Sequence, residues 1–231
     1  MTLRAVVIAA GVGSRLRPLT DVHPKPLLPI AGTPVLAAVL RELAVARCPH
    51  VTVVTGHLAE QVEAFVGDGS GWGLSVTTVR QTRPDGSADA VVAAEAEAPY
   101  LVLGADTVFA PGELARFAEG FTASAAAGAL AVRRWSDDEP KRNGVAIDAG
   151  LVRTLQVPGS EWAGAPLWAV GHAVAAIVET RPGAAPYELA TAFQRAIDAG
   201  ERVVALEIGP TRDLTTPGDL LRENFPYLAG L

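Results

Sequence analysis

The chain has 231 residues, of which 49% are hydrophobic and 19% charged, so it is long and apolar enough to bury a substantial core. The net charge of −6 argues against a surface that coats nucleic acid, and no apolar run reaches the roughly 18 residues of a membrane span. We therefore expect no nucleic-acid partner and no membrane partner. Cys48 is the single cysteine, which excludes a disulfide framework, and the cytoplasm is the expected compartment.

Apolar, β-branched segments predict the strands, and apolar residues at helical spacing predict the helices. The predicted strands are 5–9, 51–55, 74–79, 100–103, 129–132, 145–147 and 203–208, and the predicted helices are 35–46, 58–66, 88–98, 113–126, 187–199 and 218–224. Strands and helices alternate in the first half, as in an α/β fold with a mostly parallel, Rossmann-like sheet flanked by helices. The second half predicts short adjacent strands and long irregular segments, which indicate a smaller irregular lobe. All of this fits one domain, residues 1–231.

A glycine-rich segment follows the first predicted strand. It contains Ala10, Gly11, Gly13 and Ser14, and two glycines directly after a strand let backbone amides approach a polyphosphate. The third glycine of a dinucleotide-binding fingerprint would fall at Leu16, and no Gly-Lys-Ser/Thr follows, so neither the Rossmann nor the Walker pattern is satisfied. The segment predicts a polyphosphate loop of another kind.

Lys25 lies between two prolines shortly after this loop. Pro24 and Pro26 predict an extended, stiff backbone from which the Lys25 ammonium points outward, next to Arg15 of the loop. Two fixed cations suit one triphosphate. The alternative is a proline-rich surface turn with a solvated lysine, and the glycine-rich loop at this spacing argues against it.

Residues 9–34 resemble the opening signature of the sugar-1-phosphate nucleotidylyltransferases, Gly-x-Gly-Ser/Thr-Arg-Leu-x-Pro-Leu-Thr followed by Pro-Lys-Pro. The resemblance implies Mg²⁺-dependent transfer of a nucleotidyl group from a nucleoside triphosphate to a sugar 1-phosphate. It implies that Arg15 binds the leaving pyrophosphate, that Lys25 binds the α-phosphate, and that residues 10–14 hold the nucleotide. It also divides the domain into a nucleotide-binding part of about 1–110 and an acceptor-binding part of about 111–231.

A second part of the resemblance covers residues 81–90. The Gln81 amide can offer a donor and an acceptor to a base edge, and Gly86 permits close approach at a helix start. An exposed turn before a helix is the alternative for this segment alone. The resemblance implies that Gln81, Gly86 and Ser87 read the nucleobase, and it favours UTP or dTTP.

Two aspartates stand where the resemblance implies a metal site. Asp106 follows the apolar strand 100–103, and the carboxyl end of a buried parallel strand is where open α/β sheets bind ligands. A hard oxygen ligand there suits Mg²⁺. Asp213 belongs to a segment similar to the family's late Asp-x-Gly-Thr-Pro, with Thr215 in place of glycine. Either aspartate alone could be a cap or turn residue.

The acceptor side departs from the family. Val157 stands where the family has the lysine of a Glu-Lys-Pro motif that contacts the sugar phosphate. Residues 142–145 resemble a segment that lines the acceptor pocket. We therefore expect the acceptor to be bound by Gly144, Lys141 and Arg142, with Arg153 a further candidate for the missing charge.

Two alternatives remain open from the sequence. The same chemistry could act on choline phosphate, an inositol phosphate or a phosphonate, since the lysine is missing. The chain could also be a catalytically silent, nucleotide-sensing subunit, although the presence of Arg15, Lys25, Asp106 and Asp213 together argues against this. Assembly as a homo-oligomer is also left open.

Overall fold

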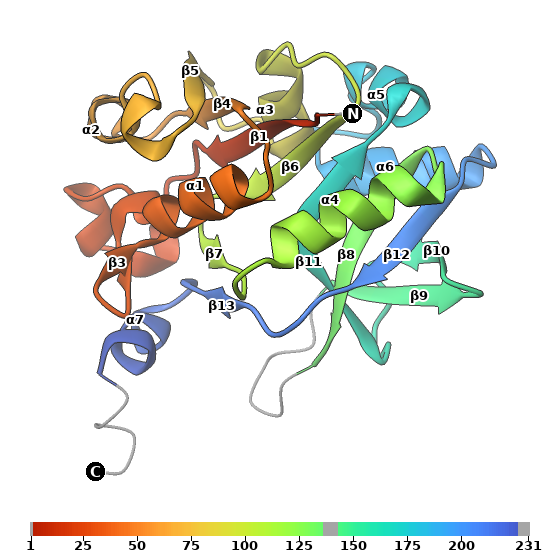
Figure 1. The fold of residues 1–231 in the computed structure, drawn as a ribbon. Helices are drawn as coiled ribbons and strands as arrows, with labels where there is room; N and C mark the ends of the chain where they lie inside the picture. The colour runs from red at the N-terminus through yellow and green to blue at the C-terminus, as the bar shows by residue number, and fades with distance from the viewer. Residues whose placement is uncertain (1, 136–142, 226–231) are drawn as a thin grey trace.

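The computed structural model describes residues 2–135 and 143–225. Nine strands form one central sheet in the order β5-β4-β1-β6-β11-β8-β12-β10-β9 (Figure 1). Their bounds are β1 (Arg4–Ala9), β4 (His50–Thr55), β5 (Ser75–Arg80), β6 (Tyr100–Gly104), β8 (Gly128–Arg134), β9 (Gly144–Asp148), β10 (Leu151–Leu155), β11 (Trp162–Val170) and β12 (Val203–Glu207). Strands β5, β4, β1 and β6 are parallel, β11 runs antiparallel to β6 and β8, and β12 is parallel to β8.

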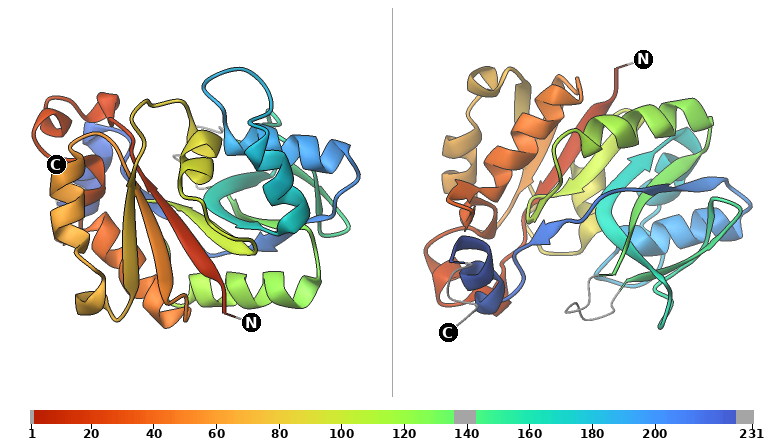
Figure 2. Two further views of the ribbon diagram at one scale, coloured as in Figure 1. Left: turned by 90° about the horizontal axis from the view of Figure 1, so that it is seen from above. Right: turned by 60° about the horizontal axis from the view of Figure 1, so that its bottom comes forward.

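Helices cover both faces of the sheet (Figure 2). One face carries α1 (Val35–Val45), α2 (Ala59–Val66) and α4 (Glu113–Ser124), and the other carries α3 (Ser87–Ala93), α5 (His172–Glu179) and α6 (Leu189–Asp198). Strand β6 shows why both faces are needed: Leu101 and Leu103 pack into the first layer and Val102 into the second, and all three are buried. Successive side chains of a strand point to opposite faces, so a strand buried on both sides is apolar throughout.

Short elements at the carboxyl edge of the parallel strands carry the loops of interest. They are the 3₁₀ helices Ser14–Leu16, Leu19–Asp21 and Lys25–Leu27, the ribbons β2 (Pro29–Ile30) with β3 (Thr33–Pro34) and β7 (Thr107–Val108) with β13 (Arg212–Asp213), and helix α7 (Pro217–Asn224). A further 3₁₀ helix, Ser70–Trp72, precedes β5 at the opposite edge. Asn224 fastens α7 to the first ribbon, since its side chain accepts from the Gly32 amide at 3.1 Å and donates to the Pro29 carbonyl at 2.7 Å. The chain after β13 is thereby held beside residues near the N-terminus.

The predicted α/β class is confirmed, and three local predictions were wrong. The segment expected to be irregular contains β11 and α5. Strand β11 was missed because most of its residues are Ala, Gly or Pro, which carry no β-branched signal. The helix expected over 88–98 ends at Ala93, and Glu95 then takes a left-handed φ of 48°. Lys25 opens a 3₁₀ helix instead of lying in an extended segment, because proline tolerates the second position of a helix.

Among residues 2–135 and 143–225, no helix is long and apolar enough to cross a membrane.

Candidate active site

The glycine-rich loop leaves β1 at the carboxyl edge of the parallel strands. Gly13 adopts a left-handed φ of 66°, and a Cβ there would lie 3.0 Å from the Thr20 side chain and 3.2 Å from Cβ of Lys25. A residue with a side chain would be strained and crowded at this position. Within the described chain, the backbone amides of Gly11, Val12 and Gly13 donate no hydrogen bond, so the loop offers unpaired donors, as a polyphosphate site requires.

A buried hydrogen-bond network supports this loop from below. The Thr20 hydroxyl, which is fully buried, donates to the Gly13 carbonyl at 3.0 Å. His57 Nε2 lies 2.6 Å from the Thr20 carbonyl, and because a carbonyl can only accept, the proton is on Nε2. The His57 amide donates to the Ala10 carbonyl at 3.2 Å. The loop is therefore held in shape from within while Ser14 and Arg15 are exposed.

Lys25 and Asp106 form an ion pair beside the loop. Lys25 Nζ lies 2.5 Å from Oδ2 of Asp106, and the two side chains are 14% and 40% exposed. Asp106 lies two residues after the end of β6, and the amide of Ala105, the residue between them, donates to the Ile8 carbonyl of β1. The pairing of β6 with β1 thus brings the lysine and the carboxylate together across 81 residues of sequence.

Asp213 reaches the same place from the far end of the chain. Strand β13 pairs with β7 so that Asp213 lies opposite Thr107, and the Leu214 amide donates to the Asp106 carbonyl at 3.2 Å. The Asp213 carboxylate accepts from the Thr107 hydroxyl at 2.5 Å and from the Thr211 hydroxyl at 3.1 Å. Burial raises the pKa of Asp213 above its ordinary value, and the negative charge of Asp106 raises this pKa further.

The two carboxylates fit a magnesium ion in their chemistry. Mg²⁺ is usually held by one or two carboxylates together with substrate phosphates and water. In the described chain no group of three or more His, Cys, Asp or Glu side chains is arranged to hold a metal, so this pair would need phosphate oxygens to complete the shell. The negative charge of Asp106 also makes ionisation of Asp213 more costly, and a divalent cation between two such carboxylates would offset this repulsion.

Arg133 is a residue that the sequence analysis missed. It lies near the end of β8, is only 8% exposed, and donates through Nε to the Thr211 hydroxyl at 3.0 Å. The same hydroxyl donates to Asp213, so Arg133, Thr211 and Asp213 form a chain of hydrogen bonds. The guanidinium charge acts against burial and lowers the pKa of Asp213. The signal in the sequence was an arginine continuing an apolar strand past its predicted end at residue 132.

The predicted base-reading segment lies on the other side of the loop. The Gln81 side-chain nitrogen donates to the Gly86 carbonyl at 3.1 Å and to Oδ2 of Asp89 at 2.9 Å. Ser87 donates through its hydroxyl to Glu188 at 2.6 Å and accepts from the Leu189 amide at 2.8 Å, so this hydroxyl links α3 to the start of α6. A role of these residues in reading a base stays a prediction.

Gly86 is required by close approach of two backbones. Its φ is 103°, and a Cβ there would lie 2.3 Å from the Tyr187 carbonyl oxygen. We expect Gly86→Ala to lower the free energy of unfolding by about 2 kcal/mol or more, because the clash is with backbone atoms that cannot rotate away. Gly112→Ala is the matched control, since Gly112 also precedes a helix with a positive φ of 80° but has open space around it. Urea unfolding measures both, and equal losses would contradict the crowding.

A cavity of about 320 Å³ opens beside Asp106, next to Gly104. Apolar residues form most of its wall, and Trp168 contributes a ring that packs against Phe193 with centroids 4.6 Å apart. Its polar side chains come from Ser87, Asn143, Gln156 and Glu188.

The predicted acceptor residues fall in three different situations. Lys141 and Arg142 lie outside the described residues. Gly144 packs its backbone against Val157, with the Val157 amide donating to the Gly144 carbonyl at 2.8 Å, and does not line the cavity. Arg153 pairs with Asp148 at 3.0 Å on the exposed β9–β10 hairpin.

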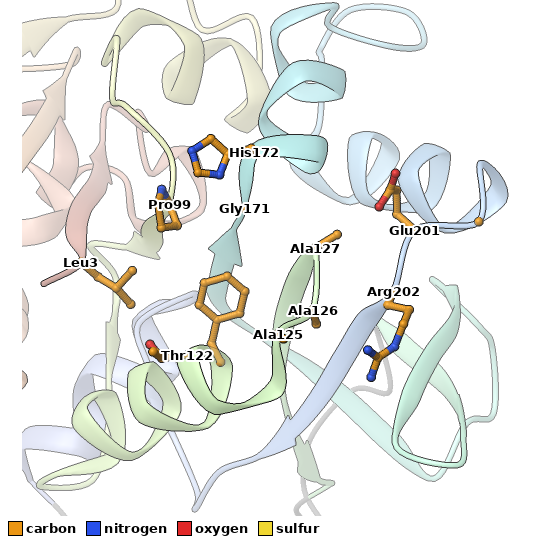
Figure 3. A pocket seen from close by; sticks show the side chains of 12 residues that line it. Leu3, Pro99, Thr122, Ala125, Ala126, Ala127, Gly171, His172, Glu201 and Arg202 are labelled. Carbon is orange, nitrogen blue, oxygen red and sulfur yellow. The ribbon is translucent and has the colours of Figure 1, made fainter. Parts of the chain in front are cut away.

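A second hollow, of about 560 Å³, lies at the opposite edge of the sheet (Figure 3). Leu3, Pro99 and Arg202 at its wall directly precede β1, β6 and β12, so it opens at the amino ends of these parallel strands. Ligands of open α/β sheets bind at the carboxyl ends. This hollow is larger than the cavity beside Asp106. The glycine-rich loop and the two aspartates nevertheless lie at the carboxyl ends, so the smaller cavity is the better candidate for a ligand site.

Comparison with known proteins shows the family of this chain. The structure brings a glycine-rich loop, a lysine–aspartate pair and a second aspartate together at the carboxyl edge of the parallel strands of an α/β sheet. The family model described as nucleotidyl transferase matches residues 4–156, and the chain belongs to this family.

Particular relatives are informative about the fold and the length. Glucose-1-phosphate thymidylyltransferase of Streptomyces griseus is 34% identical over 236 residues, which cover 96% of this chain and 65% of the relative. This chain thus spans about two thirds of the relative's length. CMP-5'-(3-aminopropyl)phosphonate synthase of Streptomyces rubellomurinus is 39% identical over 137 residues, covering 57% of this chain and 21% of that protein.

A solved structure extends the likeness in fold to nearly the whole chain. It is that of a Bacillus anthracis protein bearing the name glucose-1-phosphate thymidylyltransferase, in complex with sucrose. It superimposes with a TM-score of 0.86 at 22% identity and covers 96% of this chain and 94% of its own. The second half of the chain therefore belongs to the same fold as the parallel first half.

Proposed function

We propose that the chain transfers a nucleotidyl group from a nucleoside triphosphate to a sugar 1-phosphate. A phosphate oxygen of the acceptor attacks the α-phosphorus, a new P–O bond forms, the bond to the β-phosphate breaks, and pyrophosphate leaves. The acceptor phosphate is already ionised, so the reaction needs positioning and charge neutralisation more than a general base.

One observation carries this proposal: Lys25, Asp106 and Asp213 come together beside a loop with unpaired amides, in a chain of the nucleotidyl transferase family. A site with carboxylates but no cation would repel a triphosphate. A site with the loop and a lysine but no carboxylates would bind a triphosphate without helping it to react. A cation and two metal-type carboxylates beside a polyphosphate loop suit a reaction in which charge moves from the α-phosphate to a leaving pyrophosphate.

The residues take distinct roles in this proposal. The amides of the loop, with Ser14, hold the triphosphate; exposed Arg15 binds the leaving pyrophosphate; and Lys25 binds the α-phosphate and the attacking oxygen. Asp106 and Asp213 would hold Mg²⁺, which supplies neutralisation of phosphate charge when bound. In this proposal the first half of the domain, about 1–110, binds the nucleotide, the rest binds the acceptor, and the reaction takes place in the cytoplasm.

A screen for pyrophosphate release tests the proposal. UTP, dTTP, CTP, ATP and GTP are each combined with a panel of sugar 1-phosphates, with and without Mg²⁺. We expect release only when a triphosphate, an acceptor and the metal are all present. Triphosphate binding without release for any acceptor would instead support the silent nucleotide-sensing subunit. Sedimentation of the same preparation gives the oligomeric state.

A second acceptor class deserves a place in the panel. The relative from Streptomyces rubellomurinus is named for an aminopropylphosphonate, and the cavity beside Asp106 carries the Glu188 carboxylate and the Trp168 ring. An ammonium group would be stabilised by both. Choline phosphate, inositol phosphate and 3-aminopropylphosphonate therefore complete the screen, and preference for them by tenfold or more would favour this class over sugar phosphates.

The missing lysine at Val157 gives a prediction about the acceptor. A phosphate without a counter-charge on its outer side loses a contact of about 1.5–3 kcal/mol, so another basic residue should replace it. We expect one of the variants Lys141→Ala, Arg142→Ala and Arg153→Ala to raise the KM for the acceptor about tenfold or more and to spare that for the nucleotide. Arg153→Ala is the weakest candidate, because Arg153 already pairs with Asp148.

Steady-state kinetics with each substrate varied separately make this measurement. If all three variants keep the acceptor KM while Val157→Lys creates activity on hexose 1-phosphates, compensation is wrong and the non-sugar acceptors move ahead.

A further inference from the structure

The Gln81 amide is held in one orientation by groups that can only accept hydrogen bonds. Its nitrogen donates to the Gly86 carbonyl at 3.1 Å and to Oδ2 of Asp89 at 2.9 Å. A carbonyl oxygen accepts only, and so does an ionised carboxylate. Turning the amide over would place its oxygen against both acceptors. The orientation therefore follows from the surroundings and not from a choice between similar atoms.

Asp89 is itself kept ionised and in place. Arg181, which follows α5, donates through Nε to Oδ1 of Asp89 at 2.7 Å, and the Asp89 and Arg181 side chains are 21% and 37% exposed. The hydrogen bond from Gln81 and the contact with Arg181 lower the pKa of Asp89 below its ordinary value. One carboxylate oxygen thus serves Arg181 and the other serves Gln81.

The side-chain oxygen of Gln81 is left without a partner within residues 2–135 and 143–225 by this arrangement. Oε1 of Gln81 has no hydrogen-bond partner among the residues that the structure describes, since both hydrogen bonds of this side chain use its nitrogen. Gln81 therefore keeps an acceptor that is free to meet a ligand. A base that meets it must bring a donor.

We propose that Asp89, held by Arg181, locks Gln81 as a hydrogen-bond acceptor and thereby selects triphosphates whose base carries a ring N–H. This inference rests on the proposed nucleotidyl transfer, with Gln81 reading the base. Uracil and thymine carry a proton on N3, whereas cytosine has a bare N3 that would face the amide oxygen. Uracil and cytosine are nearly equal in size, so the donor pattern, and not the pocket's volume, separates UTP from CTP.

The first test uses the unaltered protein. The kcat/KM for UTP should exceed that for CTP by about 10–100-fold, because a site with a fixed acceptor rejects a second acceptor more strongly than it rejects a change of shape. Equal values, or a preference for CTP, would overturn the lock. Activity with some triphosphate but no such preference would leave the proposed transfer standing, so the two failures are distinguishable.

The second test removes the lock. In Asp89→Asn the new amide can donate to Gln81, so Gln81 can turn its nitrogen toward the base, and the UTP-to-CTP ratio should fall about tenfold or more, with CTP turnover rising in absolute terms. A merely structural role for Asp89 would lower both rates together and leave the ratio unchanged, and that result would contradict the proposal.

Two further variants complete the experiment. Arg181→Met keeps the charge of Asp89 but removes the group that holds the Asp89 carboxylate in place. The UTP-to-CTP ratio should therefore fall, by a smaller factor than in Asp89→Asn. Glu97→Gln is the control, since Glu97 forms an exposed pair with Arg4 at 3.7 Å, and it should leave the ratio unchanged. If Asp89→Asn does not fold, the Arg181→Met ratio and the wild-type ratio still decide the outcome.

Discussion

Replacing Lys25 by methionine should lower turnover by about 10²–10³ and leave the fold intact. Methionine fills nearly the same volume but supplies no charge where the α-phosphate develops it, and losing one such electrostatic contact typically costs about this much in rate. The Lys25 side chain is 14% exposed and its ammonium contacts Asp106. The substitution therefore removes the cation that pairs with the Asp106 carboxylate in the described part of the chain. Pyrophosphate release at saturating substrates measures the effect, and circular dichroism checks folding.

Two companion variants separate chemistry from folding. Asp106→Asn should cost a similar factor, and the double variant should cost far less than the product of the two, because residues that act as a unit are strongly non-additive. Arg116→Met removes a cation from an exposed pair with Glu113 on α4 and should leave turnover unchanged. Near-full turnover of Lys25→Met with Mg²⁺ present would remove this group of residues from the active site.

The first half of the fold could be predicted because its signals are local. Each parallel strand is a short apolar run, and the helices between them repeat apolar residues at helical spacing. Strand β11 was missed because most of its residues are Ala, Gly or Pro, so that its formation depends on pairing with β6 on one side and β8 on the other. Such pairing is a tertiary property that overrides weak local preference.

In the candidate site too, the residues could be predicted from local motifs but their contacts could not. Lys25, Asp106 and Asp213 could be named from motifs, yet their meeting depends on the β7–β13 ribbon. Each strand of this ribbon is two residues long, and its paired residues Thr107 and Asp213 are 106 residues apart in sequence. Arg133 could not be assigned a place from sequence, because an arginine after an apolar strand is ordinarily solvated. Only the structure shows that it contacts the Thr211 hydroxyl that also serves Asp213.

Replacing Asp213 by asparagine should lower activity by about 10² or more and yet make the protein more stable at neutral pH. The activity falls because the second metal-type carboxylate is lost. Stability rises because burial and the charge of Asp106 raise the pKa of Asp213 in the folded state, so the ionised form opposes folding. Active-site carboxylates held close together commonly exchange stability for function in this way.

The sign of the pH dependence follows from linkage. At a pH above the raised pKa of the folded protein, wild type carries the full penalty of an ionised Asp213 and the variant carries none. As the pH falls through that folded-state pKa, the wild-type carboxyl takes up its proton and the penalty is lost. The stability gain of Asp213→Asn should therefore be largest at neutral pH and should vanish near the ordinary pKa of aspartate.

Asp68→Asn provides a control of opposite sign. Hydrogen bonds from the Ser70 hydroxyl and amide lower the pKa of Asp68, so its ionised form supports folding. Urea unfolding midpoints between neutral pH and about pH 4 should show this variant below wild type at neutral pH and converging with it in acid. Mg²⁺ should raise the midpoint of wild type and of Asp68→Asn but not that of Asp213→Asn. An Asp213→Asn protein that is less stable than wild type at neutral pH would show that the hydrogen bonds from Thr107 and Thr211 outweigh the desolvation of this carboxylate.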